Sequence, residues 1–300
     1  MYSKKKDYKK KYLTRKCGSK KKIKKYSYYS KKKGGAKLSK SQKTLVVSHN
    51  AGFFSCCTVK LNKIIHYFNY YKQLPLILDC SKLYEYYKLN NEHDLTTEYF
   101  EDYNINKSIL YKNNIDFSYT YQFINYKLLC YDKLNSFVSK YFTPSKDVLL
   151  MIQKIEKKYK INYENICVLF FRGNDKKTET RLSNYNDYIV LAKERLKENS
   201  NIRFLIQSDE TEFIEKMLSV FPNSFYFKDE IRHMSKQNNT VDKVMTKNIL
   251  LYSKYFLAIT IIMSKCNYVI CGSGNCSLWI MLYRNNNKNV YQYLNDTWIK

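Results

Sequence analysis

The chain has 300 residues and a net charge of +27, with 53 Lys and Arg against 26 Asp and Glu. This length is enough to bury a full hydrophobic core and predicts one large or two medium domains. The longest apolar runs, residues 166–171 and 256–263, are too short to cross a membrane, so no transmembrane segment is expected. The nine Cys form no CxxC pair, which argues against a zinc site and a disulfide framework. We expect reduced thiols, a cytoplasmic location and no bound metal.

The positive charge is concentrated at the N-terminus. Residues 1–40 carry a net charge of +17, and the remainder of the chain carries +10. Blocks of like charge interleaved with Tyr and Ser, without an apolar period, predict a disordered tail over residues 1–43. The charge suits contact with RNA, DNA, an anionic membrane surface or another polyanion through residues 1–40, but it is also typical of a merely solvated polycation.

The ordered chain is predicted to begin with a βαβ unit. A short strand at residues 45–47 is followed by a polar turn, a long helix from Phe53 and a second strand at 74–79. The turn places His49, Asn50 and Gly52 at the helix N-terminus, where free N–H groups favour an anion or sugar hydroxyls. Short helices are expected at 82–87 and 133–141. The many Tyr between them either line a sugar-binding cleft or fill the core, and the core is the favoured interpretation.

From residue 145 onward, strands and helices alternate. Strands are predicted at residues 166–171, 202–207, 224–227, 268–271 and 289–293, and helices at 145–159, 184–198, 211–220, 242–265 and 276–284. Such alternation is typical of a doubly wound parallel sheet. The expected fold class is therefore α/β, with two Rossmann-like halves at 44–145 and 146–300, a cleft between them, and a disordered basic tail in front.

Three polar loops follow strands of the second half, at residues 172–176, 208–210 and 272–277. If these strands are parallel, the loops lie along one sheet edge, where open α/β sheets bind ligands. Arg172 offers a planar fork for phosphate oxygens, Lys176 adds a point charge, and the turn before the last helix offers N–H groups and hydroxyls. The pattern predicts a nucleoside-diphosphate ligand, although each residue taken singly also fits an ion pair, a helix cap or a turn. The candidate donor-binding residues are His49, Asn50, Gly52, Ser208, Asp209, Ser273, Gly274, Asn275 and Ser277.

Residues 170–180, FFRGNDKKTET, resemble a motif of the α-1,6-fucosyltransferase and nodulation fucosyltransferase group. That motif runs H-x-R-R-T-D-K and ends in a glutamate. The order of other features is also similar: a glycine loop at 52–56, Ser-Asp-Glu at 208–210, and residues 263–271 before a serine-bearing turn. The resemblance covers about residues 45–295. The heavy use of Lys, Asn, Ile and Tyr is typical of an AT-rich genome and fits a member encoded by a large DNA virus.

This resemblance implies a GT-B-like glycosyltransferase. The enzyme would transfer fucose from GDP-fucose, or another sugar from its nucleotide, to a glycan or glycoprotein hydroxyl, with inversion and without a metal or other cofactor. It implies Arg172 as the diphosphate ligand, Asp175 and Lys176 as residues that position it, and Glu179 as the general base. Ser273 and Asn275 would lie near the β-phosphate.

The sequence also departs from the family pattern. Phe170 replaces the histidine, Gly173 replaces the second arginine, and Glu179 comes one residue early. Ile259 and Thr260 stand where the family carries an aspartate that helps to hold the nucleotide. The alternative function is a non-catalytic binding protein of the same fold, whose basic tail binds nucleic acid or another polyanion.

Overall fold

The computed structural model describes residues 43–88, 94–102, 109 and 111–300, so the predicted tail lies almost wholly outside the described residues. Over these residues the chain is α/β, as predicted, and its strands form two sheets. The strands are β1 (Thr44–His49), β2 (Ile77–Leu83), β3 (Ile166–Phe171), β4 (Arg203–Ser208), β5 (Tyr268–Gly272), β6 (Val290–Leu294) and β7 (Thr297–Ile299). The α-helices are α2 (Phe53–Tyr71), α3 (Thr96–Tyr99), α4 (Tyr131–Tyr141), α5 (Lys146–Tyr159), α6 (Tyr185–Glu198), α7 (Thr211–Val220), α8 (Val241–Val244), α9 (Ile249–Lys265) and α10 (Asn275–Arg284).

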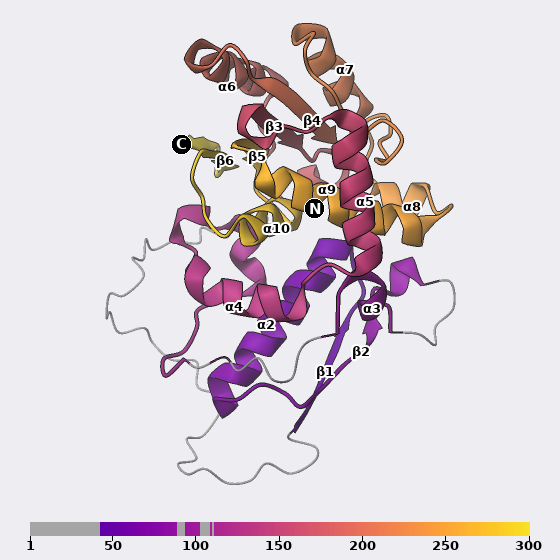
Figure 1. Ribbon diagram of the computed structural model, residues 1–300, viewed down its shortest axis with the longest axis vertical. Helices are drawn as coiled ribbons and strands as arrows, with labels where there is room; N and C mark the ends of the chain where they lie inside the picture. The colour runs from indigo at the N-terminus through magenta and orange to yellow at the C-terminus, as the bar shows by residue number, and fades with distance from the viewer. Residues whose placement is uncertain (1–42, 89–93, 103–108, 110) are drawn as a thin grey trace, which may run out of the picture.

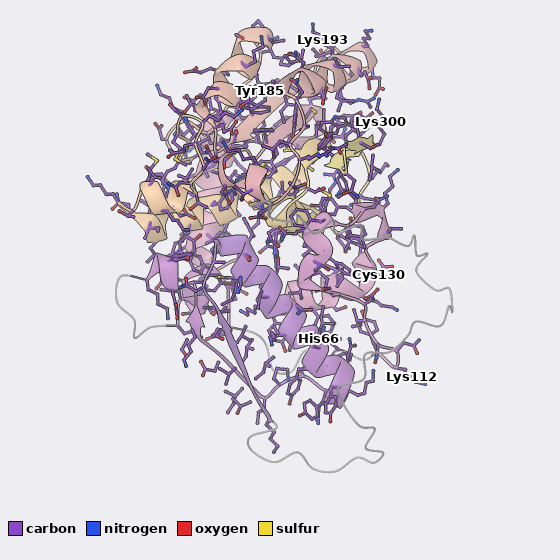
Figure 2. The ribbon with its side chains drawn as sticks, turned by 180° about the vertical axis from the view of Figure 1, so that it is seen from behind. His66, Lys112, Cys130, Tyr185, Lys193 and Lys300 are labelled. Atoms are coloured by element: carbon purple, nitrogen blue, oxygen red, sulfur yellow. The ribbon has the colours of Figure 1, made fainter. Side chains whose placement is uncertain are left out.

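The predicted N-terminal βαβ unit is confirmed. Strands β1 and β2 pair in parallel, with α2 as the connection between them. Among the described residues this sheet has two strands. The apolar positions of α2 recur at helical spacing, and Phe54, Cys57, Leu61 and Ile64 are buried, so one face of the helix packs into the core. Seen from behind, α2 with His66 lies below α6, the helix that carries Tyr185 and Lys193 (Figure 2).

The larger sheet has the strand order β4-β3-β5-β6-β7. Strands β4, β3, β5 and β6 are parallel, and β7 is antiparallel to β6. From β3 the chain crosses to β4 on one side, and from β4 it crosses back past β3 to β5 on the other side. The strand order therefore reverses between β3 and β5. Ligands of open α/β sheets bind at such a switch point, outside the carboxyl ends of the strands. Helices α6 and α7 lie above the sheet in Figure 1, and α9 and α10 lie below it.

Strand β3 is an interior strand of this sheet, between β4 and β5, and all six of its residues are buried. Its side chains alternate between two hydrophobic clusters, with Val168 and Phe170 on the α9 side and Leu169 and Phe171 on the α6 side. Burial on both faces explains the unbroken apolar run in the sequence. The α9-side cluster also contains residues of α2, so the core is continuous from the N-terminal unit to the larger sheet.

Four predicted features differ in the structure. Residues 224–227 form no strand, and only Phe225 makes a bridge, to Leu205. The predicted helix 242–265 is two helices, α8 and α9. The Met245 carbonyl accepts a hydrogen bond from Arg232, and Asn248 has a φ of 55°, which interrupts the helix. The predicted helix 82–87 is wrong in its first part, because β2 continues to Leu83.

The fourth difference is covalent. Seven of the nine cysteines are buried free thiols, as predicted, but Cys130 is joined in a disulfide. The expectation of reduced thiols throughout was therefore wrong at this position. Strand β7 was not predicted at all, because its three residues are too few to show a period. Within the described ranges, no helix combines the length and the apolar character needed to cross a bilayer.

We predict that Leu169→Ala lowers the free energy of unfolding by about 2–5 kcal/mol, because Leu169 is fully buried and its loss leaves a cavity beside β3. The control is Leu150→Ala in α5, whose side chain is 52% exposed and which we expect to change stability by no more than about 0.5 kcal/mol. Urea unfolding of both variants measures the difference. Equal effects would contradict the central position of β3 in the core.

Candidate functional site

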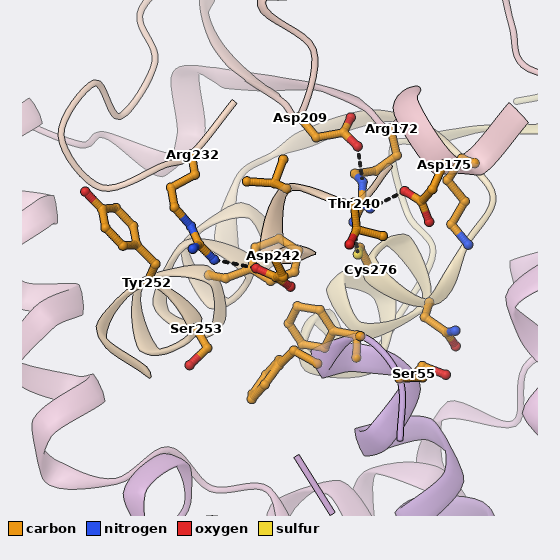
Figure 3. A pocket seen from close by; sticks show the side chains of 18 of the residues that line it. Ser55, Arg172, Asp175, Asp209, Arg232, Thr240, Asp242, Tyr252, Ser253 and Cys276 are labelled. Atoms are coloured by element: carbon orange, nitrogen blue, oxygen red, sulfur yellow. Dashed lines mark hydrogen bonds and ion pairs between the residues drawn. The ribbon is translucent and has the colours of Figure 1, made fainter. Parts of the chain in front are cut away.

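A cleft of about 360 Å³ opens at the switch point, between the start of α2 and the carboxyl edge of the larger sheet. Its volume is within the range of small-molecule sites. The lining comes from the loop before α2, the ends of β3 and β4, residues 230–243, α9 and the start of α10. Figure 3 shows two polar ends, with Arg172, Asp175 and Asp209 on one side and Arg232, Asp242 and Tyr252 on the other.

Arg172 follows β3 directly and is held by three groups. Its Nε donates to Asp209 Oδ2 at 2.9 Å, its Nη2 donates to Asp175 Oδ1 at 3.1 Å, and its Nη1 lies 3.2 Å from Cys276 Sγ. Burial opposes the charge, but the neighbouring Asp209 and Asp175 carboxylates outweigh it and raise the pKa of Arg172 above its ordinary value. The guanidinium is therefore a fixed cation at the switch point.

Asp209 also fixes the loop that carries Arg172. Its Oδ1 accepts the backbone N–H of Gly173 at 2.9 Å, and its own carbonyl accepts from the Asn174 side chain at 2.8 Å. Parallel pairing of β3 with β4 places these groups side by side, because Phe171 and Ser208 are in register. Asp209, predicted as a donor-binding residue, thus orients the arginine in this structure.

Lys176 and Glu179 form a second ion pair on the same loop. Lys176 Nζ lies 2.6 Å from Glu179 Oε2 and 3.4 Å from Gln122 Oε1. The Lys176 side chain is 9% exposed, whereas the Glu179 side chain is 41% exposed. The lysine therefore points into the cleft region, and the carboxylate remains accessible to an incoming molecule.

The structure brings most of the predicted residues to this cleft. Its lining includes Asn50, Gly52, Arg172, Asp175, Lys176, Glu179, Ser208, Asp209 and Asn275. Ser273, Gly274 and Ser277 line a small adjoining cavity of about 20 Å³ instead. His49 lines neither space; its Nε2 is 2.9 Å from Ser55 Oγ, and burial lowers its pKa.

The serine hydroxyls of the loop at residues 272–277 donate hydrogen bonds to backbone carbonyls. Ser273 Oγ donates to the Tyr293 carbonyl at 2.7 Å, and Ser277 Oγ donates to the Gly272 carbonyl at 2.6 Å. The Asn275 side chain accepts from Thr58 at 2.9 Å, which ties α10 to α2. These side chains hold the loop in place, and a ligand would have to displace those bonds to reach them.

Sequence reasoning missed the other polar end of the cleft. Arg232 pairs with Asp242, whose second oxygen accepts from Tyr87 at 2.7 Å, and Tyr87 accepts the Phe53 N–H at 2.7 Å. This chain of hydrogen bonds links residues 230–243 to the start of α2. The segment has no apolar period, so the sequence gives no signal that it forms a wall of the cleft.

The charges in the cleft are mostly paired. The basic lining residues are Arg172, Lys176, Arg232 and Lys243, and the acidic ones are Asp175, Glu179, Asp209, Glu230 and Asp242. Three of the four basic side chains contact a carboxylate of the lining. An anionic ligand must therefore compete for them. Asp175 is the carboxylate most easily displaced from Arg172, because it is 22% exposed, whereas Asp209 is 7% exposed and holds two donors.

Beneath the Arg172 loop lies a buried carboxylate. Glu210 is fully buried, accepts from the Tyr185 hydroxyl, and has no partner for Oε1. A Cβ on Gly173 would stand 1.9 Å from that oxygen, so residue 173 must be glycine unless Glu210 moves. Burial raises the pKa of Glu210. The described residues contain no cluster of three His, Cys, Asp or Glu suited to a metal ion.

Comparison with known proteins gives partial similarity of fold. No protein-family model and no curated protein sequence matches the chain. Among solved structures, NodZ α-1,6-fucosyltransferase co-crystallised with GDP matches with 10% identity and a TM-score of 0.37, over 54% of this chain and 50% of that chain. A variant of Arabidopsis thaliana FUT1 in complex with GDP matches with 10% identity and a TM-score of 0.34, over 57% and 39%. The chain thus spans half or less of the length of these proteins.

We predict that Glu210→Gln changes the pH dependence of stability. Because the folded state raises the pKa of Glu210, its ionisation destabilises the fold as the pH rises from about 4.5 through the raised pKa. Glutamine does not ionise, so the variant avoids this loss of stability, and its side-chain oxygen can still accept the hydrogen bond from the Tyr185 hydroxyl. The thermal midpoint of the variant should therefore exceed that of the parent by a margin that grows with pH. The exposed Glu101→Gln is the control, and a margin independent of pH would refute the assignment.

Proposed function

We propose that the chain is an inverting, metal-independent glycosyltransferase that transfers a sugar, fucose from GDP-fucose by family resemblance, to a hydroxyl of a glycan or glycoprotein. The observation that carries the proposal is the fixed guanidinium of Arg172 at the switch point, beside Lys176 and a cleft of nucleotide size. The resemblance of residues 170–180 to the fucosyltransferase motif supports it. In this proposal residues 146–300 bind the nucleotide and residues 44–145 form the acceptor side of a GT-B-like fold.

The reaction follows from the positions of three side chains. An acceptor hydroxyl oxygen attacks the anomeric carbon while the bond from that carbon to the diphosphate oxygen breaks. Arg172 and Lys176 stabilise the negative charge that develops on the departing diphosphate, and the start of α10 adds a favourable dipole. Glu179, at the accessible rim, takes the proton of the acceptor hydroxyl. Cationic side chains thus perform the role that a metal ion has in other transferases.

The test is a thermal-shift screen of the full chain against GDP, UDP, ADP, CMP and their sugar conjugates, with and without EDTA. A ligand that binds only the folded state raises the unfolding midpoint. We expect stabilisation by GDP or GDP-fucose that is insensitive to EDTA and absent in Arg172→Ala, a variant that should also lack transferase activity. Stabilisation of Arg172→Ala equal to that of the parent would place the site elsewhere.

The alternative is a non-catalytic protein that binds a polyanion through residues 1–40. The +17 charge of that segment is the observation that favours it. No shift with any nucleotide, together with salt-sensitive RNA or DNA binding that disappears when residues 1–40 are deleted, would replace the transferase proposal with this one.

Substitutions of the two aspartates that contact Arg172 should change the affinity for a nucleotide in opposite directions. We predict that Asp175→Asn tightens nucleotide binding by about two- to fivefold, because it removes a carboxylate that competes with phosphate for Nη2. Asp209→Asn should weaken binding by about tenfold, because it loosens both Arg172 and the Gly173 N–H. Titration calorimetry with GDP measures both. Weakening by both substitutions would show that Asp175 positions the arginine rather than competes for it.

A further inference from the structure

Gln207 is a buried polar side chain in the cleft whose hydrogen-bonding capacity is unused. It is the fifth residue of β4, it is 4% exposed, and its Nε2 has no hydrogen-bond partner. A buried amide donor without a partner costs free energy, so natural structures seldom keep one without a reason. Among the side chains that line the cleft, Gln207 alone contributes an atom to the buried and unpartnered set of the described residues.

Gln207 shares its face of the sheet with apolar side chains of the cleft lining. Phe170 is its register partner on β3, so both side chains lie on the α9 side of the sheet. Ile259 and Met263 of α9 belong to the same hydrophobic cluster and also line the cleft. The result is an apolar wall with one polar group, which is the composition that suits a nucleobase: a ring face to pack and an edge to hydrogen-bond.

The distance to Arg172 fits a nucleotide. Phe170, beside Gln207, precedes Arg172 by two residues, which is about 7 Å along an extended strand. A diphosphate on Arg172 therefore leaves its base within reach of Gln207. The carboxylates of the cleft are occupied: Asp209 by Arg172, Glu179 by Lys176, and the remaining three, Asp175, Glu230 and Asp242, by Arg172, Lys158 and Arg232 respectively.

We infer that Gln207 contacts the base edge of the nucleoside-diphosphate donor and makes base selection permissive; this rests on the proposed function of the cleft. An amide offers one donor group and one acceptor, and a half-turn of its last torsion exchanges them. It pairs equally with the N–H and carbonyl of guanine and with those of uracil. A carboxylate, which only accepts, would select guanine, because guanine presents two adjacent N–H donors. The site consequently accepts GDP and UDP with similar affinity.

The test compares Gln207→Leu and Gln207→Glu with the parent, by calorimetric titration of the full chain with GDP and UDP. The parent should bind both within about tenfold. Gln207→Leu should weaken both by about three- to tenfold, the loss of one hydrogen bond. Gln207→Glu should raise the ratio of GDP to UDP affinity by about fivefold or more. Gln122→Leu is the control: its Oε1 accepts from Lys176 and the Asn275 N–H, so it should affect both nucleotides alike.

Unfolding without ligand separates a binding role from a structural one. Gln207→Leu removes an unpartnered buried donor, so its thermal midpoint should rise even as its nucleotide affinity falls. A lower midpoint, or unchanged affinity and ratio in both variants, would overturn the inference while nucleotide binding by the parent stands. Failure of the parent to bind any nucleoside diphosphate would instead remove the proposed function, and the inference with it.

Discussion

A guanidinium at the edge of a sheet has to be paired, and the pairing of Arg172 organises the site. Three segments distant in the sequence meet at this side chain: Asp209 after β4, Asp175 in the loop after β3, and Cys276 at the start of α10. The desolvation of an unpaired cation costs several kcal/mol. The contacts of the three segments with Arg172 offset this cost and so stabilise their arrangement around it. The same pairing keeps the cation in the cleft with its position fixed before any ligand arrives.

The rest of the cleft depends on contacts between the N-terminal unit and the larger sheet. Trp279 Nε1 of α10 donates to Thr58 of α2 at 3.0 Å, and Thr58 in turn contacts Asn275. On the opposite side, Tyr87 links Asp242 to the Phe53 N–H. The cleft is thus bounded on both sides by hydrogen bonds that cross from one unit to the other. A substitution at Thr58 or Tyr87 would alter the cleft without touching a ligand.

Much of the fold could be predicted because its signals are local. The unbroken apolar run of β3 and the Ser145 cap of α5 are visible in single stretches of sequence, and both are confirmed. The meeting of the polar loops followed from the parallel order of the strands. The roles within the loops could not be predicted, since Ser273 and Ser277 use their hydroxyls on nearby carbonyls. Whether a hydroxyl serves the backbone or a ligand depends on register, which no local pattern encodes.

The wall formed by residues 230–243 also escaped prediction, because it is held by side-chain contacts between residues ten or more positions apart in the sequence. Arg232 binds Asp242 within α8 and the carbonyl of Met245, the residue that follows α8. The sequence predicts that Gln207 is the last residue of a strand and indicates no function for it, because a polar residue at the end of an apolar strand is common. Only the three-dimensional structure shows that its amide lacks a partner beside an open cleft.

Hydrogen exchange of the full chain with and without GDP tests the central claim most directly, because it reports where the nucleotide binds. Binding at Arg172 predicts slower exchange of backbone amides at residues 172–178, 208–210 and 274–278, with the same amides unchanged in Arg172→Ala. Slower exchange confined to residues 1–40, or equal protection in the variant, would contradict the account.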